Sequence, residues 1–360
     1  MREQQRQTAG EGAQQLQVSG DLIINTGVTE ERAAEIARGI ARSEMERFSS
    51  EANELGTQRI SDFSDRLIEE FSAKAQLGAF ADPAFQVLLR KAQAGAASTD
   101  RETDYDLLVA LLDDRVKRGS DRHIRAGLDQ AVQMVDHVDG EALLGLTVLQ
   151  AAQQFGPLHG QIDRGLDLMD NLFEQLMQDS LPEDMPWLDH LDVLGAVRVM
   201  HLGLGTLKPF DEYYPDAHFI GYLSPGIEVG SDQESRVAEE LAAASVRMES
   251  IDHELRPGFR RLPFVTVRHF DRVVEKFPFQ STIGAEVARR IAVEEYGLGT
   301  AMPELREPLI QKLEERPNLQ RLRAWWNSIP TGVQITAVGR VLATANAKRL
   351  DKRGLLPPLD

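Results

Sequence analysis

Histidine is the side chain best suited to acid–base and metal chemistry near neutral pH, and the sequence contains eight of them. Two histidines stand next to carboxylates, in Asp189-His-Leu-Asp192 and in Asp252-His-Glu254. No histidine has another four residues away, so the pair of ligands that a helix presents to zinc is absent from the sequence. Two interpretations stay open: solvated polar helix faces, or a metal- or His/Asp-dependent hydrolase in which the fold brings both groups together.

Two other segments match known catalytic or phosphate-binding patterns only in part. Gly203-Leu-Gly205 follows a predicted helix and lacks the third glycine of a dinucleotide-binding loop, so we interpret it as a helix C-terminus. Ser224 lies one residue out of register for a nucleophile elbow, and Pro225 favours a turn there. The sequence therefore predicts no catalytic residue, no metal ligand and no cofactor, and a non-enzymatic role is favoured.

Aromatic residues gather between positions 208 and 231, where three of the five tyrosines lie. We predict a long structured loop here, with a short strand pair at 219–223 and 227–229. Tyrosine provides a large contact area at low entropic cost. The loop is therefore a candidate site for a partner protein, and its candidate residues are Tyr213, Tyr214, Phe219 and Tyr222.

The segment 16–28 has the pattern of a β-strand. Its apolar residues alternate with a period of two, and Ile23 makes the other face partly apolar as well. A single strand cannot pair its own N–H and C=O groups, so we predict that copies of this leader pair with one another. The predicted self-association residues, in the leader and the helix that follows, are Leu16, Val18, Leu22, Ile23, Ile24, Val28, Ile36 and Ile40.

A long amphipathic helix is predicted over residues 29–78. Thr29 is a suitable N-cap, and Glu30 and Glu31 complement the positive end of the helix dipole. Large apolar residues recur at spacings of mostly three to five up to Phe71, without proline. The heptad spacing of these residues is not strict, so the sequence does not predict a supercoil.

Beyond this helix the pattern indicates helix after helix with short polar connections. Asp121 and Asp139 stand where the next helix would need an N-cap. The predicted fold is mainly α, with an N-terminal β-strand leader, a long helix, and then an α-helical bundle or irregular α-solenoid. The predicted parts are a disordered 1–15, the leader 16–28, the helix 29–78, an α-helical domain 79–350 and an irregular tail 351–360.

Composition restricts the class of protein further. The chain has 360 residues, a formal net charge of −17 and no cysteine, which disfavours nucleic-acid and anionic-membrane partners and removes thiolate chemistry. Two basic runs, 115–125 and 348–353, lack interleaved aromatics and are interpreted as solvated surface. No apolar segment is long enough for a signal peptide or a membrane span, so a cytoplasmic protein is expected.

Both ends of the chain resemble known bacterial sequences. Gly20-Asp-Leu-Ile-Ile-Asn-Thr-Gly-Val-Thr-Glu-Glu31, followed by a long helix rich in Ala, Glu and Arg, resembles the opening of a set of bacterial proteins whose C-terminal parts vary. Residues 326–330 and 334–349 are similar to the C-terminal region of one uncharacterised family in that set. The resemblance implies a portable leader module, of a kind found in conflict or defence systems, and implies no catalytic residues.

These observations favour a self-assembling scaffold or sensor that forms a homo-oligomer through its N-terminal strand and long helix. Two alternatives remain, the hydrolase described above and a helical adaptor that binds a partner protein through residues 208–231.

Overall fold

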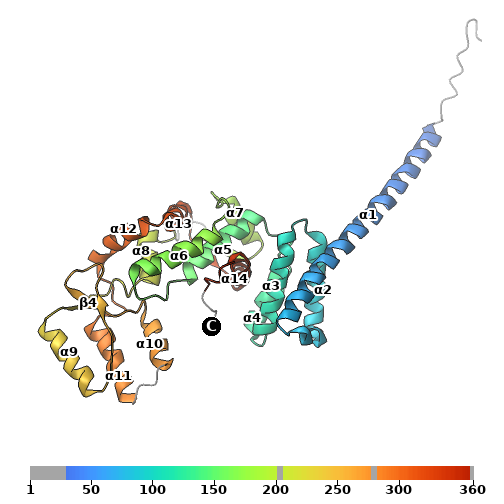
Figure 1. Cartoon of the computed structure of the whole chain (residues 1–360). Coiled ribbons are helices and arrows are strands. Elements are labelled where there is room, and N and C mark those ends of the chain that lie inside the picture. Colours follow the sequence, from blue (N-terminus) through green and yellow to red (C-terminus); the bar gives the residue numbers. More distant parts are fainter. Residues whose placement is uncertain (1–29, 201–205, 277–281, 357–360) are drawn as a thin grey trace, which may run out of the picture. The chain divides into compact units, whose positions relative to one another are not determined.

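The computed structural model describes residues 30–200, 206–276 and 282–356, and these are mainly α-helical, as predicted (Figure 1). The predicted strand leader lies outside the described residues. The α-helices are α1 (Glu30–Ala73), α2 (Pro83–Ser98), α3 (Glu102–Arg118), α4 (Arg122–Val132), α5 (Gly140–Gln154), α6 (Ile162–Leu176), α7 (Pro186–Val193), α8 (Phe210–His218), α9 (Asp232–Ala243), α10 (Val267–Lys276), α11 (Thr282–Arg290), α12 (Arg306–Glu314), α13 (Pro317–Ser328) and α14 (Ala337–Leu350).

Short strands and single helical turns complete the described chain. The strands are β1 (Val197–Val199), β2 (Ile227–Glu228), β3 (Ile251–Asp252), β4 (Phe259–Arg261) and β5 (Val333–Ile335). Strands β1 and β5 form an antiparallel pair, and β2, β4 and β3 form an antiparallel sheet in that order. Two 3₁₀ turns, η1 (Leu77–Ala81) and η3 (Pro303–Leu305), and a π-helical turn, η2 (Ile291–Glu295), join longer elements.

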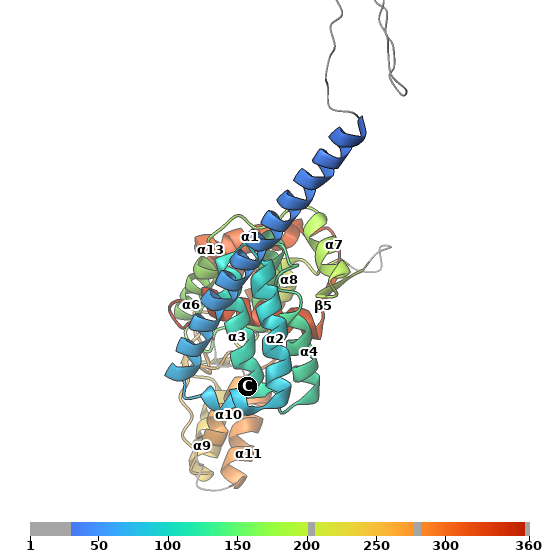
Figure 2. The same ribbon diagram turned by 90° about the vertical axis from the view of Figure 1, so that its right-hand side faces the viewer.

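Contacts between Cα atoms divide the chain into two units, with the boundary inside α1 between Leu55 and Gly56. In the unit that begins at Gly56, the rest of α1 lies against the following helices. Phe63 and Phe71 are fully buried, and the Phe71 ring lies 5.7 Å from that of Phe80 and 5.8 Å from that of Phe85. Helices α2, α3 and α4 contact one another (Figure 2), and this part of α1 is hydrogen-bonded to α2 through Arg59 and to α3 through Arg66.

Aspartate side chains fix where several of these helices begin. Asp121 accepts hydrogen bonds from the backbone N–H groups of His123 and Ile124, and Asp139 caps α5 in the same way. Both caps are among those predicted from the sequence. Each satisfies N–H groups that have no partner within the helix.

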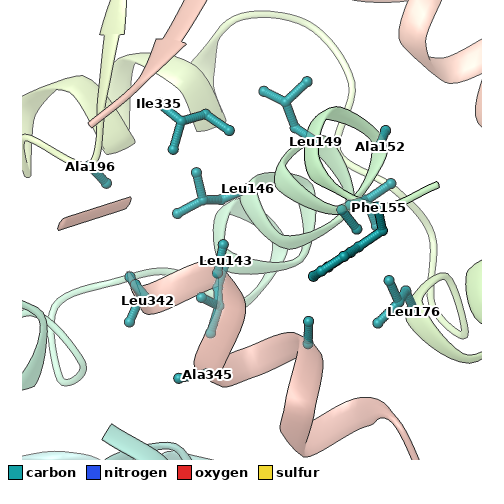
Figure 3. Packing of buried hydrophobic residues seen from close by; sticks show 14 of the residues in the cluster. Leu143, Leu146, Leu149, Ala152, Phe155, Leu176, Ala196, Ile335, Leu342 and Ala345 are labelled. Atoms are coloured by element: carbon teal, nitrogen blue, oxygen red, sulfur yellow. The ribbon is translucent and has the colours of Figure 1, made fainter. Parts of the chain in front are cut away.

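Helix α14 lies at the centre of the main hydrophobic core and contacts α3, α4 and α5. Most of its buried residues are small, which lets neighbouring backbones approach closely. Gly339 shows this best, because a Cβ atom there would lie 2.0 Å from the carbonyl oxygen of Ala196. Leu143 and Leu146 of α5 lie in this core together with Leu342 and Ala345 of α14 and Ile335 of β5 (Figure 3).

A second, smaller hydrophobic cluster holds α9, α10, α11 and η2 to the three-stranded sheet. Its centre includes Val237, Phe270 and Ile291, all buried. Arg261 of β4 is fully buried nearby and forms an ion pair with Glu254. The ring of Phe264 packs edge-on against that of Phe270, with the centroids 5.0 Å apart.

The structure differs from the sequence prediction in several segments. The predicted loop 208–231 contains a helix, α8, and β2 pairs with β4 instead of with residues 219–223. Strands β1 and β5, which pair with each other, lie in the part of the chain where the sequence pattern predicts only helices. The pairing of β1 with β5 joins segments more than 100 residues apart, and local sequence patterns do not contain such information.

Candidate functional site

The predicted self-association residues fall in two places. Leu16, Val18, Leu22, Ile23, Ile24 and Val28 lie outside the described residues. Ile36 and Ile40 lie one turn apart on α1, with 45% and 59% of their surface exposed. The first unit of the chain therefore carries apolar side chains that its own described residues leave exposed.

The same part of α1 carries an apolar seam that continues over six turns. At about 100° per residue, its members fall within an arc of about 80°, and no charged residue falls in that arc between its ends. The seam consists of Ala34, Ala37, Ala41, Met45, Phe48, Ala52 and Leu55. The three large members, Met45, Phe48 and Leu55, are 69%, 57% and 52% exposed.

The spacing within the seam has a structural meaning. Successive members are three or four residues apart, with a mean spacing of 3.5 residues. This mean equals that of a left-handed coiled coil, in which one side of a helix faces its partner, but the two successive spacings of four from Ala37 to Met45 depart from a strict heptad. The alanines allow close approach, and Met45, Phe48 and Leu55 provide the apolar area.

Charged residues of opposite sign flank the seam. On one side, Arg47 forms ion pairs with both Glu44 and Glu51, and its guanidinium carbon lies 4.7 Å from the centre of the Phe48 ring. Arg38 and Arg42 lie on the other side of the seam, by their helical positions. In a parallel pair of α1 helices, the flank with Glu44 of one copy would face the flank with Arg38 and Arg42 of the other. In an antiparallel pair, each flank would face the same flank of the other copy.

The sequence prediction named Ile36 and Ile40 for self-association, and its apolar stripe on this helix did not distinguish the seam from these two isoleucines. These two isoleucines lie on the adjoining side of the helix. Counting alanine as apolar shows the regular spacing of three and four between positions 34 and 55. That signal was available in the sequence.

The four aromatic candidates for partner binding have a different environment. Tyr214, Phe219 and Tyr222 are fully buried, and Tyr213 is half-buried with its ring stacked 5.1 Å from that of Trp326. Burial raises the pKa of the phenols of Tyr214 and Tyr222. These side chains pack the core, so they do not offer an exposed aromatic surface to a partner.

The histidine–carboxylate groups bind different parts of the chain. His190 Nε2 accepts a hydrogen bond from the backbone N–H of Asp139, and Asp192 accepts one from that of Val199. His253 Nε2 is hydrogen-bonded to the carbonyl oxygen of Ser224, whereas Glu254 pairs with Arg261. Within the described ranges, no group of three or more His, Asp or Glu residues could hold a metal ion.

The remaining sequence candidates have structural roles or lie outside the described chain. Gly203 and Gly205 are among the residues that the structure leaves undescribed. The Ser224 hydroxyl is buried and donates to the carbonyl oxygen of Gly221. In the basic runs, Arg115 pairs with Asp129, and other members are paired with Asp113, Asp114 and Glu174. No helix of the described ranges has the length and apolar character required to cross a bilayer.

Comparison with known proteins identifies a family but no characterised relative. One family model matches residues 27–224, which is more than half of the chain, and the chain therefore belongs to that uncharacterised family. The match begins just before α1 and includes the whole seam. Comparison with curated proteins and with solved structures gave no match.

Proposed function

We propose that this family member is a non-enzymatic scaffold or sensor that self-assembles through its N-terminal segment 16–28 and the seam on α1. The observation that supports this proposal is the exposed seam of seven apolar residues at a mean spacing of 3.5. An exposed apolar surface of this regularity is more typical of an interaction site than of solvated helix.

A second copy of the same helix is the partner that fits the seam best. The seam offers small residues beside large ones, so two copies in register would approach closely at the alanines and bury Phe48 and Leu55. Each such large side chain contributes about 1.5–3 kcal/mol when fully buried. This gain is available to a helix pair without any change in the helix itself.

The flanking charges favour a parallel arrangement. In a parallel pair, the flank with Glu44 and Glu51 faces the partner flank with Arg38 and Arg42. In an antiparallel pair, the flanks that carry Arg38 and Arg42 would meet each other, which costs energy at short range. Parallel helices would also bring the two copies of segment 16–28 to the same end of the assembly, where the leader strands can pair.

The seam is tested by matched charge substitutions in the full chain. We expect Phe48→Glu with Leu55→Glu to lower the mass in light scattering to that of one chain, because both glutamates would have to be buried. The control is Ser43→Glu with Ser50→Glu, which adds the same charge to the face of the helix opposite the seam. Glutamate favours helix, so neither pair of changes should break α1. Equal masses for the two double variants would refute the seam as the interface.

The leader is tested separately. Deletion of residues 1–28 should lower the oligomeric mass, and Ile24→Lys should have the same effect if the strands stack in register. If the protein without residues 1–28 has the same oligomeric mass as the full chain, assembly depends on α1 and the proposed role of the leader is contradicted.

A further inference from the structure

A cavity of about 660 Å³ lies in the unit that begins at Gly56, and its walls come from the last turns of α1, from α3 and from the end of α14. The volume is in the range of about 300–1,000 Å³ that small-molecule sites occupy. The wall at the end of α14 consists of three basic residues, Lys348, Arg349 and Lys352. The whole lining contains six basic and four acidic residues, so it carries a positive charge in a chain of net charge −17.

Ion pairs within the chain account for most of the charges in this lining. These pairs are Arg66–Asp106, Lys74–Glu70, Lys74–Asp113, Lys117–Asp113 and Lys348–Asp114. Two lining cations, Arg349 and Lys352, form no ion pair with any residue that the structure describes. Among the lining carboxylates, Glu69 alone has no such partner in the described ranges, and it is exposed. The cavity therefore contains two cations that its own ion pairs do not neutralise.

Arg349 is the more strongly held of these two cations. Its side chain is half-buried, and Nε donates to Oδ1 of Asn346 over 3.0 Å. Its terminal nitrogens, Nη1 and Nη2, have no acceptor within the described part of the chain, and neither is a buried atom. Burial lowers the pKa of Arg349, and Asp104 and Asp106 oppose this effect without forming an ion pair with it. A partly dehydrated guanidinium of this kind is stabilised by a bound oxyanion.

Lys352 provides a second positive charge at the same cavity. It lies three residues after Arg349, and its side chain is exposed. Val109 and Ala110 of α3 add apolar surface to the lining. A ligand that uses these groups together has two anionic ends joined by a short carbon chain.

We propose that this cavity binds a small dicarboxylate. One carboxylate accepts from Nη1 and Nη2 of Arg349, because guanidinium groups bind carboxylate oxygens in pairs. The other carboxylate lies at the ammonium group of Lys352, and the carbon chain packs against Val109 and Ala110. This site is independent of the self-assembly proposed above.

Calorimetry on the full chain tests this site with three probes: glutarate, pentanoate and inorganic phosphate. Pentanoate has the same number of carbon atoms as glutarate but one carboxylate, and phosphate has no carbon chain. We expect glutarate to bind, with the other two probes at least about tenfold weaker. Absence of glutarate binding would overturn the proposal. Equal affinity for pentanoate would overturn the role of the second carboxylate, and equal affinity for phosphate would overturn the preference for a dicarboxylate.

Charge-removing variants locate the bound glutarate. Arg349→Gln should weaken binding by about tenfold, because the paired hydrogen bonds are lost. Lys352→Gln should weaken it by about fivefold. The control is Lys91→Gln, which removes one charge from an exposed position of α2 outside the cavity and should change the affinity by less than about twofold. An equal loss in this control would contradict the site.

Glu69→Gln provides a test in the opposite direction. It removes the lining carboxylate that has no ion pair in the described chain, so it should strengthen glutarate binding by about twofold to fivefold. Lys352 and Glu69 are both exposed, so these two variants test the site even if Arg349→Gln destabilises the fold. Circular dichroism of each variant confirms folding. Unchanged affinity in both Lys352→Gln and Glu69→Gln would overturn the proposal.

Discussion

Asn346 of α14 donates a hydrogen bond from Nδ2 to Oγ1 of Thr147 on α5 over 2.8 Å, and both side chains are buried. The Thr147 hydroxyl donates in turn to the carbonyl oxygen of Leu143, and Oδ1 of Asn346 accepts from Arg349. The network lies inside an otherwise apolar interface, where unpaired polar groups are costly. It therefore fixes the register of α14 against α5.

Asn346→Ala should lower the free energy of unfolding by about 1–3 kcal/mol, because it leaves Arg349 Nε without its acceptor and opens a space in the core. Urea unfolding followed by circular dichroism measures this change. Gln320→Ala, at an exposed position of α13, is the control and should change the stability by less than about 0.5 kcal/mol. Equal stability of the two variants would argue against a structural role for the network.

Gly339 is the position where α14 approaches the chain before β1 most closely. We expect Gly339→Ala to destabilise the protein by about 1–3 kcal/mol, because the new methyl group would collide with the backbone oxygen of Ala196. Gly39→Ala on α1 is the matched glycine control. No atom lies within 4 Å of a Cβ at Gly39, so this change should preserve or increase helix stability. Thermal unfolding of both variants distinguishes the two sites, and a loss only in Gly39→Ala would contradict this account.

Local signals in the sequence predicted the helices and several of their ends. Asp121 and Asp139 were identifiable as caps because capping depends on residues only two or three positions away. The α8 helix was missed because Pro209 and Pro215 indicate a loop locally. Burial of Phe210 and Tyr214, which stack with ring centroids 4.5 Å apart, outweighs that signal.

The candidate sites were predictable only in part. The seam on α1 depends on spacing within one helix and could be found in the sequence. The pocket of about 450 Å³ that Arg118, His218 and Arg272 line could not be predicted, because these residues become neighbours only through the fold. The burial of Tyr214 and Tyr222 could not be predicted from the sequence either, because tyrosine occurs both in protein cores and at interfaces.

Arg261 should be essential for stability of the smaller hydrophobic cluster. Its guanidinium is fully buried, contacts Glu254 at 2.6 Å and donates to the carbonyl oxygen of Gly160 at 2.7 Å. Arg261→Met should cost about 3–5 kcal/mol, because Glu254 and the carbonyl oxygen lose their donor. Arg260→Met is the control, since the neighbouring Arg260 is 45% exposed and lies 3.7 Å from Asp252. In chemical denaturation, this control should lose less than about 1 kcal/mol of its free energy of unfolding. Similar losses in the two variants would contradict the role of the buried pair.

The free energy of unfolding should decrease as the pH is lowered, because His218 is buried in its neutral form. Its pKa is lowered to about 4 in the folded protein, whereas a histidine in the unfolded chain has a pKa of about 6.5. Between these values the unfolded chain binds a proton that the folded protein does not. The contribution of His218 is therefore complete above about pH 6.5 and is lost as the pH falls toward about 4.

For the wild type, we expect His218 to account for about 2 kcal/mol of the stability lost between about pH 7 and pH 5. His218→Gln keeps a donor toward Ala152 but does not titrate. This variant should therefore lose about 2 kcal/mol less stability than the wild type over the same pH range. His137→Gln, at a histidine whose side chain is 66% exposed, should retain the wild-type dependence. Identical pH profiles for wild type and His218→Gln would contradict the buried neutral state.

The mass of the intact protein in solution tests the central claim most directly. Light scattering over a range of concentrations should give a multiple of the 40.1 kDa chain mass that decreases on dilution. A mass of 40.1 kDa at every concentration would contradict self-assembly through the leader and α1.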